Sequence, residues 1–231
     1  MKNYFLVSVM LLALITQLVT GCKEDEPQAF ASSGVIVRSV MDKGVPVYAL
    51  VQQVQSNTPM DTAIVTDPTG STYGLMEHHG NPYDFRLEPA LESYSTNPPK
   101  EGPFTYKVKF NTGEQLSLPN SIVMPYIIPA KNIALSKNTT DNPQSVVLTW
   151  DAVPNAEAYS IEVTSGTDRI FHSHHLFTLE PGKNGSIKFP LYEFSAYKGK
   201  TILFKVVAYD LISIDAAINS TSWATVTWIA E

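Results

Sequence analysis

Apolar and polar residues alternate in short runs along most of this chain, most clearly at 146–150 and 158–163. Successive side chains of a β-strand point to opposite faces, so this alternation predicts strands with one buried and one solvated side. The inward positions of the two runs are Val146, Leu148, Trp150, Tyr159, Ile161 and Val163. Pro154-Asn155 between the runs is typical of a turn. The pattern therefore predicts two strands joined by a short connection.

Similar runs predict further strands on both sides of this pair. Before it, we expect strands at 34–41, 45–54, 61–66, 105–110, 115–118 and 122–128. After it, we expect strands at 169–180, 186–191, 201–209 and 223–228. Residues 76–102 contain four prolines and predict loops, with one short strand at 85–87.

The composition supports an all-β fold. The chain has 231 residues, with 16 Pro and 12 Gly spread along its length between many short β-rich runs, as in a sandwich or barrel. About seven predicted strands precede residue 128, which indicates an immunoglobulin-like β-sandwich at 33–128. A linker at 129–132 opens a second domain, 129–231. We therefore predict two tandem β-sandwiches.

The second domain resembles a fibronectin type III domain. The residues that carry the resemblance are Leu148, Trp150, Ala158, Tyr159, Ile161 and Val163, an L-x-W pair and a Y-x-I-x-V run at the positions of the second and third strands. The run at 201–209 resembles the sixth strand, although Ile202 stands where that family usually has a tyrosine. The resemblance implies a sandwich over about residues 130–231. It does not imply a chemistry, because this fold carries many functions.

The N-terminus predicts export and lipid anchoring. A short positive segment is followed by an uncharged apolar run at 4–19, which is too short to span a bilayer and is typical of a signal peptide, here 1–21. Residues 18–22, Leu-Val-Thr-Gly-Cys, resemble a bacterial lipobox, which implies cleavage before Cys22 and acylation of its thiol and new amine. An ordinary signal peptide beside an incidental thiol is the alternative. Several acyl chains would make a stable membrane anchor.

The segment after Cys22 suggests where the anchor faces. Residues 22–32 form an acidic tether, and Lys23-Glu24-Asp25-Glu26 resembles the export signal of Bacteroidetes surface lipoproteins. The resemblance implies the outer membrane with the protein facing the cell exterior, whereas a solvated tether alone would leave the leaflet open. Asp61-Thr62-Ala63 fits the O-glycosylation pattern of that phylum and makes Thr62 a candidate modification site.

Charge and cysteine content narrow the classes of partner. Removal of residues 1–21 takes away one lysine and changes the formal net charge from −6 to −7. Because phosphate binding rests on clustered Lys and Arg, we expect no nucleic-acid partner. Cys22 is the only cysteine, so no disulfide is expected once it is acylated.

No catalytic motif stands out. The sequence contains no G-x-S-x-G, no H-E-x-x-H, no P-loop and no dinucleotide fingerprint, so we expect neither enzymatic activity, nor catalytic residues, nor a cofactor. His172 and His174 would share one face of a strand about 6–7 Å apart, within reach of one metal ion. A secure site needs three or four ligands, so these two remain weak metal candidates and no metal is predicted.

Aromatic residues are the candidates for ligand contact, because an exposed ring can stack on a sugar. Trp150 and Trp228 have inward parity and are expected in the core, whereas Trp223 has the opposite parity and should face outward or lie at the entry of its strand. The aromatic residues of loop-like stretches are Tyr83, Phe85, Tyr94 and Tyr197. Of all these, Trp223 and Tyr197 are the predicted ligand-binding residues.

The sequence as a whole favours a lipid-anchored surface protein that acts as a non-catalytic binding or adhesion module. The expected partner is a polysaccharide or a neighbouring surface protein, besides the outer membrane itself. The alternative is a structural spacer, or a fimbria-type subunit that docks by strand addition at an open sheet edge.

Overall fold

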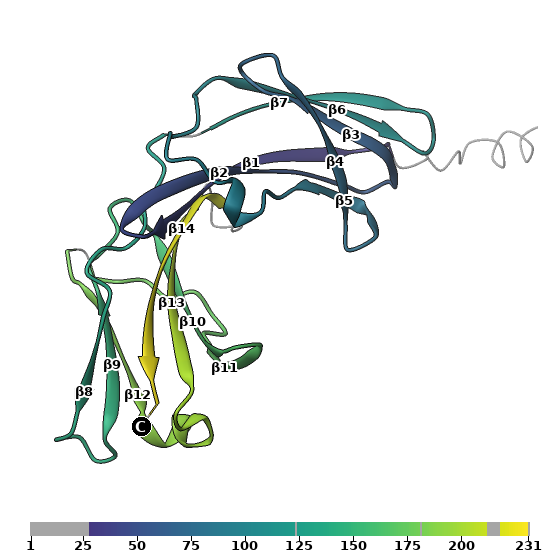
Figure 1. The fold of residues 1–231 in the computed structure, drawn as a ribbon. Coiled ribbons are helices and arrows are strands. Elements are labelled where there is room, and N and C mark those ends of the chain that lie inside the picture. Colours follow the sequence, from purple (N-terminus) through teal and green to yellow (C-terminus); the bar gives the residue numbers. More distant parts are fainter. Residues whose placement is uncertain (1–27, 123, 181, 212–217, 231) are drawn as a thin grey trace, which may run out of the picture. The chain divides into compact units, whose positions relative to one another are not determined.

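The computed structural model describes residues 28–122, 124–180, 182–211 and 218–230. The predicted signal peptide, Cys22 and residues 22–27 of the acidic tether lie outside the described residues. The chain divides after Phe30, and the compact unit Ala31–Glu231 carries every strand (Figure 1). Within the described residues, no helix has the length and apolar character needed to cross a membrane.

The first half of this unit is an antiparallel sandwich of seven strands. Their bounds are β1 Ala31–Asp42, β2 Val45–Ser56, β3 Met60–Thr66, β4 Thr72–His78, β5 Asn81–Leu87, β6 Pro103–Phe110 and β7 Gln115–Ser121. The strand order is β1-β2-β5-β4-β3-β6-β7. Figure 1 shows β3, β6 and β7 in one layer and β1, β2 and β5 in the other, with β4 passing between them. This is the A-B-E-D and C-F-G order of an immunoglobulin-like sandwich, as predicted.

Strand alternation places the core of the first sandwich as the sequence predicted. On β6 the residues Phe104, Tyr106, Val108 and Phe110 are fully buried, while Lys107 and Lys109 between them are exposed. The hydroxyl of Tyr106 donates to the carbonyl of Gly34 at 3.0 Å and also bonds the buried side chain of Gln52, and thereby joins β6 to β1 and β2. Burial raises the pKa of Tyr106, so the phenol stays a donor.

Two predictions for the first sandwich differ from the structure. The strand predicted at 85–87 is present but is longer, because it belongs to β5, and residues 76–78 belong to β4, a strand that was not predicted. β4 and β5 form a hairpin that turns at His79-Gly80, where both residues have positive φ. Phe85 lies in this strand and is a buried core residue, although the surrounding stretch is loop-like in sequence.

The other error concerns 122–128, whose described residues form no strand. Pro125 has no N–H to donate to a ladder. The amide of Ile127 donates instead to the side chain of Ser220 at 3.1 Å, and the hydroxyl of Ser39 donates to the carbonyl of Ile127 at 3.0 Å.

The second half of the unit is a sandwich of two sheets. Its strands are β8 Ala134–Asn138, β9 Ser145–Trp150, β10 Ala158–Ser165, β11 Asp168–His172, β12 Gly185–Pro190, β13 Thr201–Leu211 and β14 Ile218–Ile229. One layer has the order β12-β9-β8 and the other β11-β10-β13-β14. The runs assigned to the second, third and sixth strands of a type III domain are β9, β10 and β13, the second, third and sixth strands of this half. The predicted strand at 169–180 is shorter, because β11 ends at His172.

Aromatic side chains fill the space between these two sheets. Trp150 on β9 is buried, and its ring centre lies 6.1 Å from Tyr159 and 6.3 Å from Phe177. The predicted inward positions of β13, Ile202, Phe204, Val206 and Ala208, are all buried. Burial of one such large side chain contributes about 1.5–3 kcal/mol, so this layer carries much of the stability of the half.

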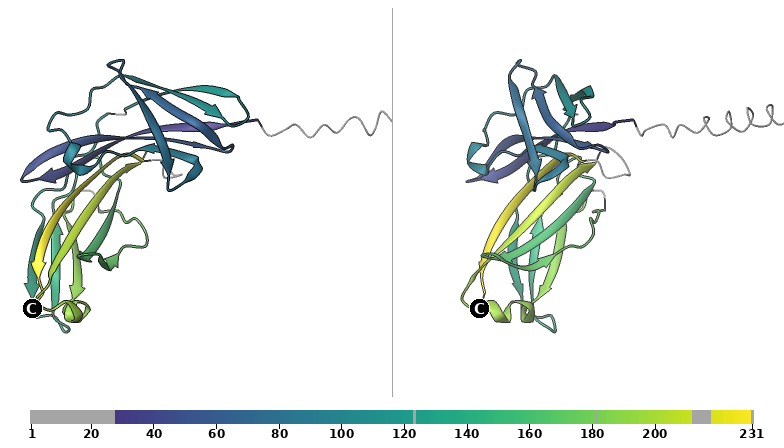
Figure 2. Two further views of the ribbon diagram at one scale, coloured as in Figure 1. Left: turned by 45° about the vertical axis from the view of Figure 1, so that its right-hand side comes forward. Right: turned by 90° about the vertical axis from the view of Figure 1, so that its right-hand side faces the viewer.

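The two halves share a continuous sheet. Residues 37–40 of β1 pair in parallel with residues 220–223 of β14, which makes one sheet of 11 strands (Figure 2). The β1–β2 hairpin has 12 residues in each strand and turns at Lys43-Gly44, with φ of 47° and 81°. The division into domains 33–128 and 129–231 remains a prediction, since β1 takes part in both sandwiches.

Candidate functional site

The candidate site lies on the outer face of the sheet that joins β11, β10, β13, β14 and β1. Cross-strand partners point to the same side of a sheet, so the register identifies which side chains meet there. Glu162 on β10 pairs with His172 on β11 and Lys205 on β13. Trp223 on β14 pairs with Val207 on β13. The residues of opposite parity on β10 and β13 are buried in the core, which leaves these side chains on the outside.

This face contains a hollow of ≈ 450 Å³, which we call the Trp223 hollow. It is lined by Arg38, Glu88, Ser160, Glu162, His172, Lys205, Val207, Tyr209, Ile218, Thr221 and Trp223. Nine of these residues lie on β10, β11, β13 and β14 of the second sandwich, while Arg38 and Glu88 come from β1 and from the segment after β5. The hollow therefore combines an indole, an arginine, a lysine, a histidine, two carboxylates and several hydroxyl groups.

Trp223 is the centre of this arrangement. The guanidinium carbon of Arg38 lies 5.5 Å from the centre of the indole, and the ammonium of Lys205 lies 5.0 Å from it. Both distances are within the range of a cation–π contact. Tyr94 approaches the indole edge-on, with ring centres 6.4 Å apart. The predicted outward parity of Trp223 is confirmed, but the ring is half-buried and its neighbours hold it in place.

Ion pairs fix the charged side chains around the indole. Arg38 bonds the carboxylate of Glu88, and this contact lowers the pKa of Glu88 against the opposing effect of partial burial. Glu162 lies between two cations, with 3.3 Å to the ammonium of Lys205 and 3.9 Å to Nε of Arg169. These partly exposed pairs contribute little stability each, about 0–1 kcal/mol. Their main effect is to orient the polar groups of the hollow.

The structure does not support the expected arrangement of the histidines. β11 ends at His172, and His174 follows in an exposed bend, so the two imidazoles do not share a strand face. His172 lines the Trp223 hollow, whereas His174 does not. In the described part of the chain, no three His, Cys, Asp or Glu side chains gather as metal ligands would.

The remaining sequence-predicted residues lie elsewhere. Tyr197 is the half-buried last residue of the 3₁₀ helix η2, Leu191–Tyr197. The ammonium of Lys200 lies 5.5 Å from its ring centre, and Tyr197 does not line the Trp223 hollow. Trp228 is half-buried against Phe194, with ring centres 5.3 Å apart. Thr62 is exposed on β3, where a modifying enzyme could reach it.

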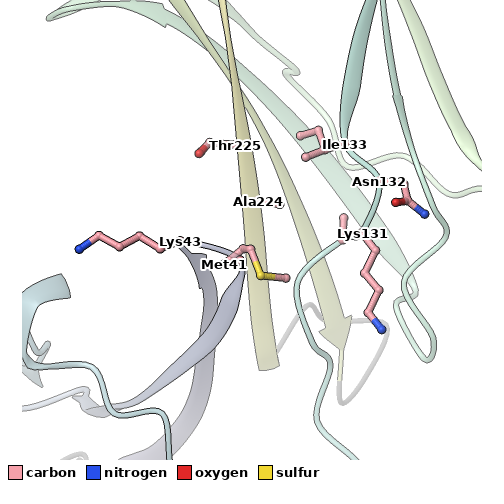
Figure 3. Close-up of a pocket in the computed structure, with 9 residues that line it drawn as sticks. Met41, Lys43, Lys131, Asn132, Ile133, Ala224 and Thr225 are labelled. Carbon is pink, nitrogen blue, oxygen red and sulfur yellow. The ribbon is translucent and has the colours of Figure 1, made fainter.

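Two other hollows are less suited to ligand recognition. The hollow in Figure 3, ≈ 570 Å³, lies beside Met41, Ile133 and Ala224, and its two lysines, Lys43 and Lys131, extend in different directions. Its cations therefore do not converge on one ligand, and its lining residues include no aromatic ring.

A third hollow, ≈ 320 Å³, has Tyr48, Leu50 and Tyr73 among its lining residues. Its one charged side chain, Asp67, accepts the amides of Thr69 at 2.8 Å and Ser71 at 3.0 Å. The Asp67 carboxylate is therefore already hydrogen-bonded within its own turn, and the Trp223 hollow is the better candidate for a binding site.

Comparison with known proteins gives no family. No protein-family model matches the chain, and no curated protein does. Solved structures resemble it weakly. A candidate carbohydrate-binding protein from Bacteroides uniformis is 15% identical with a TM-score of 0.33, over 84% of this chain and 98% of that one.

Two adhesin structures are similar at the same level. A tandem repeat from the extending region of a large adhesion protein is 12% identical with a TM-score of 0.28, over 86% of this chain and 50% of that one. A bacterial ice-binding adhesin of 1.5 MDa is 15% identical with a TM-score of 0.27, over 87% of this chain and 64% of that one. At these scores the similarities do not decide what this chain does, and the proposal below rests on its own surface.

Sequence reasoning found Trp223 but missed the residues around it. The sequence pattern could have identified Lys205 and Glu162, since both occupy outward positions of predicted strands. No local pattern could have identified Arg38, because it lies 185 positions before Trp223 and reaches it only through the β1–β14 pairing.

Proposed function

We propose that this chain is a non-catalytic module that binds glycans in the Trp223 hollow. The observation that carries the proposal is the half-buried indole flanked by Arg38 and Lys205 on an outward-facing sheet. An aromatic ring supplies a stacking surface for a sugar, and pre-oriented charged and hydroxyl side chains supply hydrogen bonds to its substituents. Both carboxylates of the hollow are in ion pairs, which suits recognition rather than proton transfer.

The test is a glycan and mucin array probed with residues 27–231, which include the whole compact unit. Trp223→Ala should reduce binding at least about ten-fold, in line with the loss of a central aromatic contact. Trp223→Phe should lose less, because a smaller stacking surface remains. Tyr192→Ala is the matched control, since Tyr192 is an aromatic residue that is 64% exposed outside the hollow. Equal binding by all four proteins would exclude the Trp223 hollow as the site.

We also propose that the protein is held at the outer face of the outer membrane by acyl chains on Cys22. The support is the apolar run followed by a lipobox-like sequence and an acidic tether. Cys22→Ala should move the protein from the membrane fraction to the soluble fraction, and protease treatment of intact cells should remove the wild-type protein. An alanine variant that stays in the membrane would exclude lipid anchoring at this residue.

Docking by strand addition is the competing function, and it requires an open edge strand. β7 is an edge strand of the continuous sheet, but the side-chain Nδ2 of Asn120 donates to the carbonyl of Ser33 at 2.7 Å, and Pro119 has no N–H to offer an added strand. This edge is therefore partly closed. A monomer at every concentration in size-exclusion chromatography is the expected result, whereas polymers formed after N-terminal proteolysis would favour a fimbria-type subunit.

A further inference from the structure

We infer that the Trp223 hollow prefers saccharides that carry an anionic group over their neutral counterparts. This inference rests on the proposed glycan-binding function and names the class of ligand. It follows from the charges that surround the indole and from the way in which they are paired.

The charge count around the hollow is unbalanced. The lining residues alone are balanced, with Arg38 and Lys205 against Glu88 and Glu162. Arg169 does not line the hollow but lies 3.9 Å from Glu162, so the ion pairs of the lining residues hold three cations and two carboxylates. Within these ion pairs one positive charge is therefore in excess, and it comes from Arg169 beside the hollow. The whole chain, in contrast, has a formal net charge of −6. A local positive excess on an acidic protein attracts an anionic ligand to that place on the surface.

The pairing shows where the excess lies. Arg38 has Glu88 as its own partner, whereas Lys205 and Arg169 share Glu162, and the contact of Arg169 is the longer one at 3.9 Å. One carboxylate cannot fully neutralise two cations. A ligand carboxylate or sulfate that approaches Lys205 would supply the missing negative charge, and a charge-assisted hydrogen bond is about twice as strong as a neutral one.

The geometry lets one ligand use the ring and the charge together. Lys205 reaches within 5.0 Å of the indole centre on a flexible stem, and its side chain is 30% exposed. A sugar ring that stacks on Trp223 must displace this ammonium from the ring. The displaced ammonium remains beside the sugar, where an anionic substituent would hold it and a neutral one would not.

The experiment uses an array of matched pairs: sialyllactose and lactose, oligogalacturonate and its methyl ester, and sulfated and desulfated chondroitin. For at least one pair the acidic member should bind residues 27–231 about five-fold more tightly or more, the size of one partly exposed ion pair. The preference should shrink as sodium chloride is raised from 50 to 500 mM, since salt screens exposed charges. Which pair shows it distinguishes a carboxylate from a sulfate.

Lys205→Gln should bring the acidic-to-neutral binding ratio close to one. The matched control is Lys109→Gln, because Lys109 on β6 is also a lysine in an ion pair, 3.2 Å from Asp61, but lies outside the hollow. Circular dichroism and thermal unfolding confirm that the variants are folded.

The outcomes separate the two proposals. Equal binding of acidic and neutral members that still depends on Trp223 would overturn the charge preference and leave the glycan-binding function standing. A charge preference that survives in Lys205→Gln would overturn the role assigned to Lys205. Absence of binding to every probe, or binding that ignores Trp223→Ala, would overturn the proposed function and this inference together.

Discussion

Gly185 on β12 lies directly against the indole of Trp150 on β9. The two residues are cross-strand partners, and a Cβ atom on Gly185 would stand 1.9 Å from Cε2 and 2.1 Å from Cζ2 of the tryptophan. A side chain at 185 therefore has no room unless the indole moves. The largest side chain of the second core thus depends on the absence of a side chain on the neighbouring strand.

Gly185→Ala should destabilise the protein by about 1–3 kcal/mol or more, because the added methyl group overpacks a buried site. Chemical denaturation followed by tryptophan fluorescence measures the change. Gly74→Ala is the matched control, since Gly74 is also a strand glycine without positive φ and has nothing within 4 Å of an added Cβ. It should leave stability nearly unchanged. Similar losses for both variants would show that strand glycines matter here for backbone reasons, not for contact with Trp150.

Tyr106→Phe should lower the free energy of unfolding by about 1–3 kcal/mol. The change removes the hydroxyl that bonds Gly34 and the buried side chain of Gln52, and it leaves a buried acceptor without its donor. Tyr192→Phe, at an exposed tyrosine, should be neutral. Equal stability of both variants would mean that the Tyr106 hydroxyl does not hold the two layers of the first sandwich together.

Ser220→Ala should loosen the contact between β14 and the segment after β7. Its hydroxyl accepts the amide of Ile127 at 3.1 Å and donates to Asp210 at 3.1 Å, and Ser220 is fully buried. Without that acceptor the Ile127 amide is left unpaired, so its hydrogen exchange should accelerate and stability should fall by about 1–3 kcal/mol. Ser117→Ala, at an exposed serine of β7, is the control. Unchanged exchange at Ile127 in Ser220→Ala would refute this role.

Asp84 should make the stability depend on pH in the acid range. Partial burial acts to raise the pKa of Asp84, but bonds from Arg86 at 2.8 and 3.0 Å, with His78 at 3.5 Å, outweigh it and hold the pKa below its ordinary value. A carboxyl with a lowered pKa in the folded state stabilises the fold above the pKa of the unfolded state, about 3.9, and loses this contribution as the pH falls through the folded pKa. Wild-type protein should therefore lose stability below about pH 4.

Asp84→Asn tests this directly, since an amide cannot titrate. Urea unfolding between pH 2 and 7 should show a wild-type advantage at pH 5–7 that disappears in stronger acid. Parallel curves for the two proteins across the whole range would contradict the assignment to Asp84.

Strands with clean alternation could be read from the sequence. β6 and β13 place apolar side chains at every second position, and their inward residues are buried as predicted. β4 could not be recognised, because Leu75 is its only buried residue and Tyr73, Gly74 and Met76 are exposed. Its strand character comes from hydrogen bonds to β3 and β5 on either side, which no local pattern encodes.

The residues of the candidate site also divide into those that the sequence could predict and those that it could not. The sequence by itself determined that the fold is all-β, that Trp150 faces a core and that Trp223, Glu162 and Lys205 face outward, because side-chain direction in a strand follows from parity alone. Only the tertiary structure decided that Arg38 reaches Trp223, that Glu88 pairs with Arg38 and that His174 lies away from His172. Those relationships depend on which strands pair and in what register, and the parallel pairing of β1 with β14 joins segments more than 180 residues apart. Local alternation fixes the face on which a side chain lies, whereas pairing between distant strands fixes its neighbours.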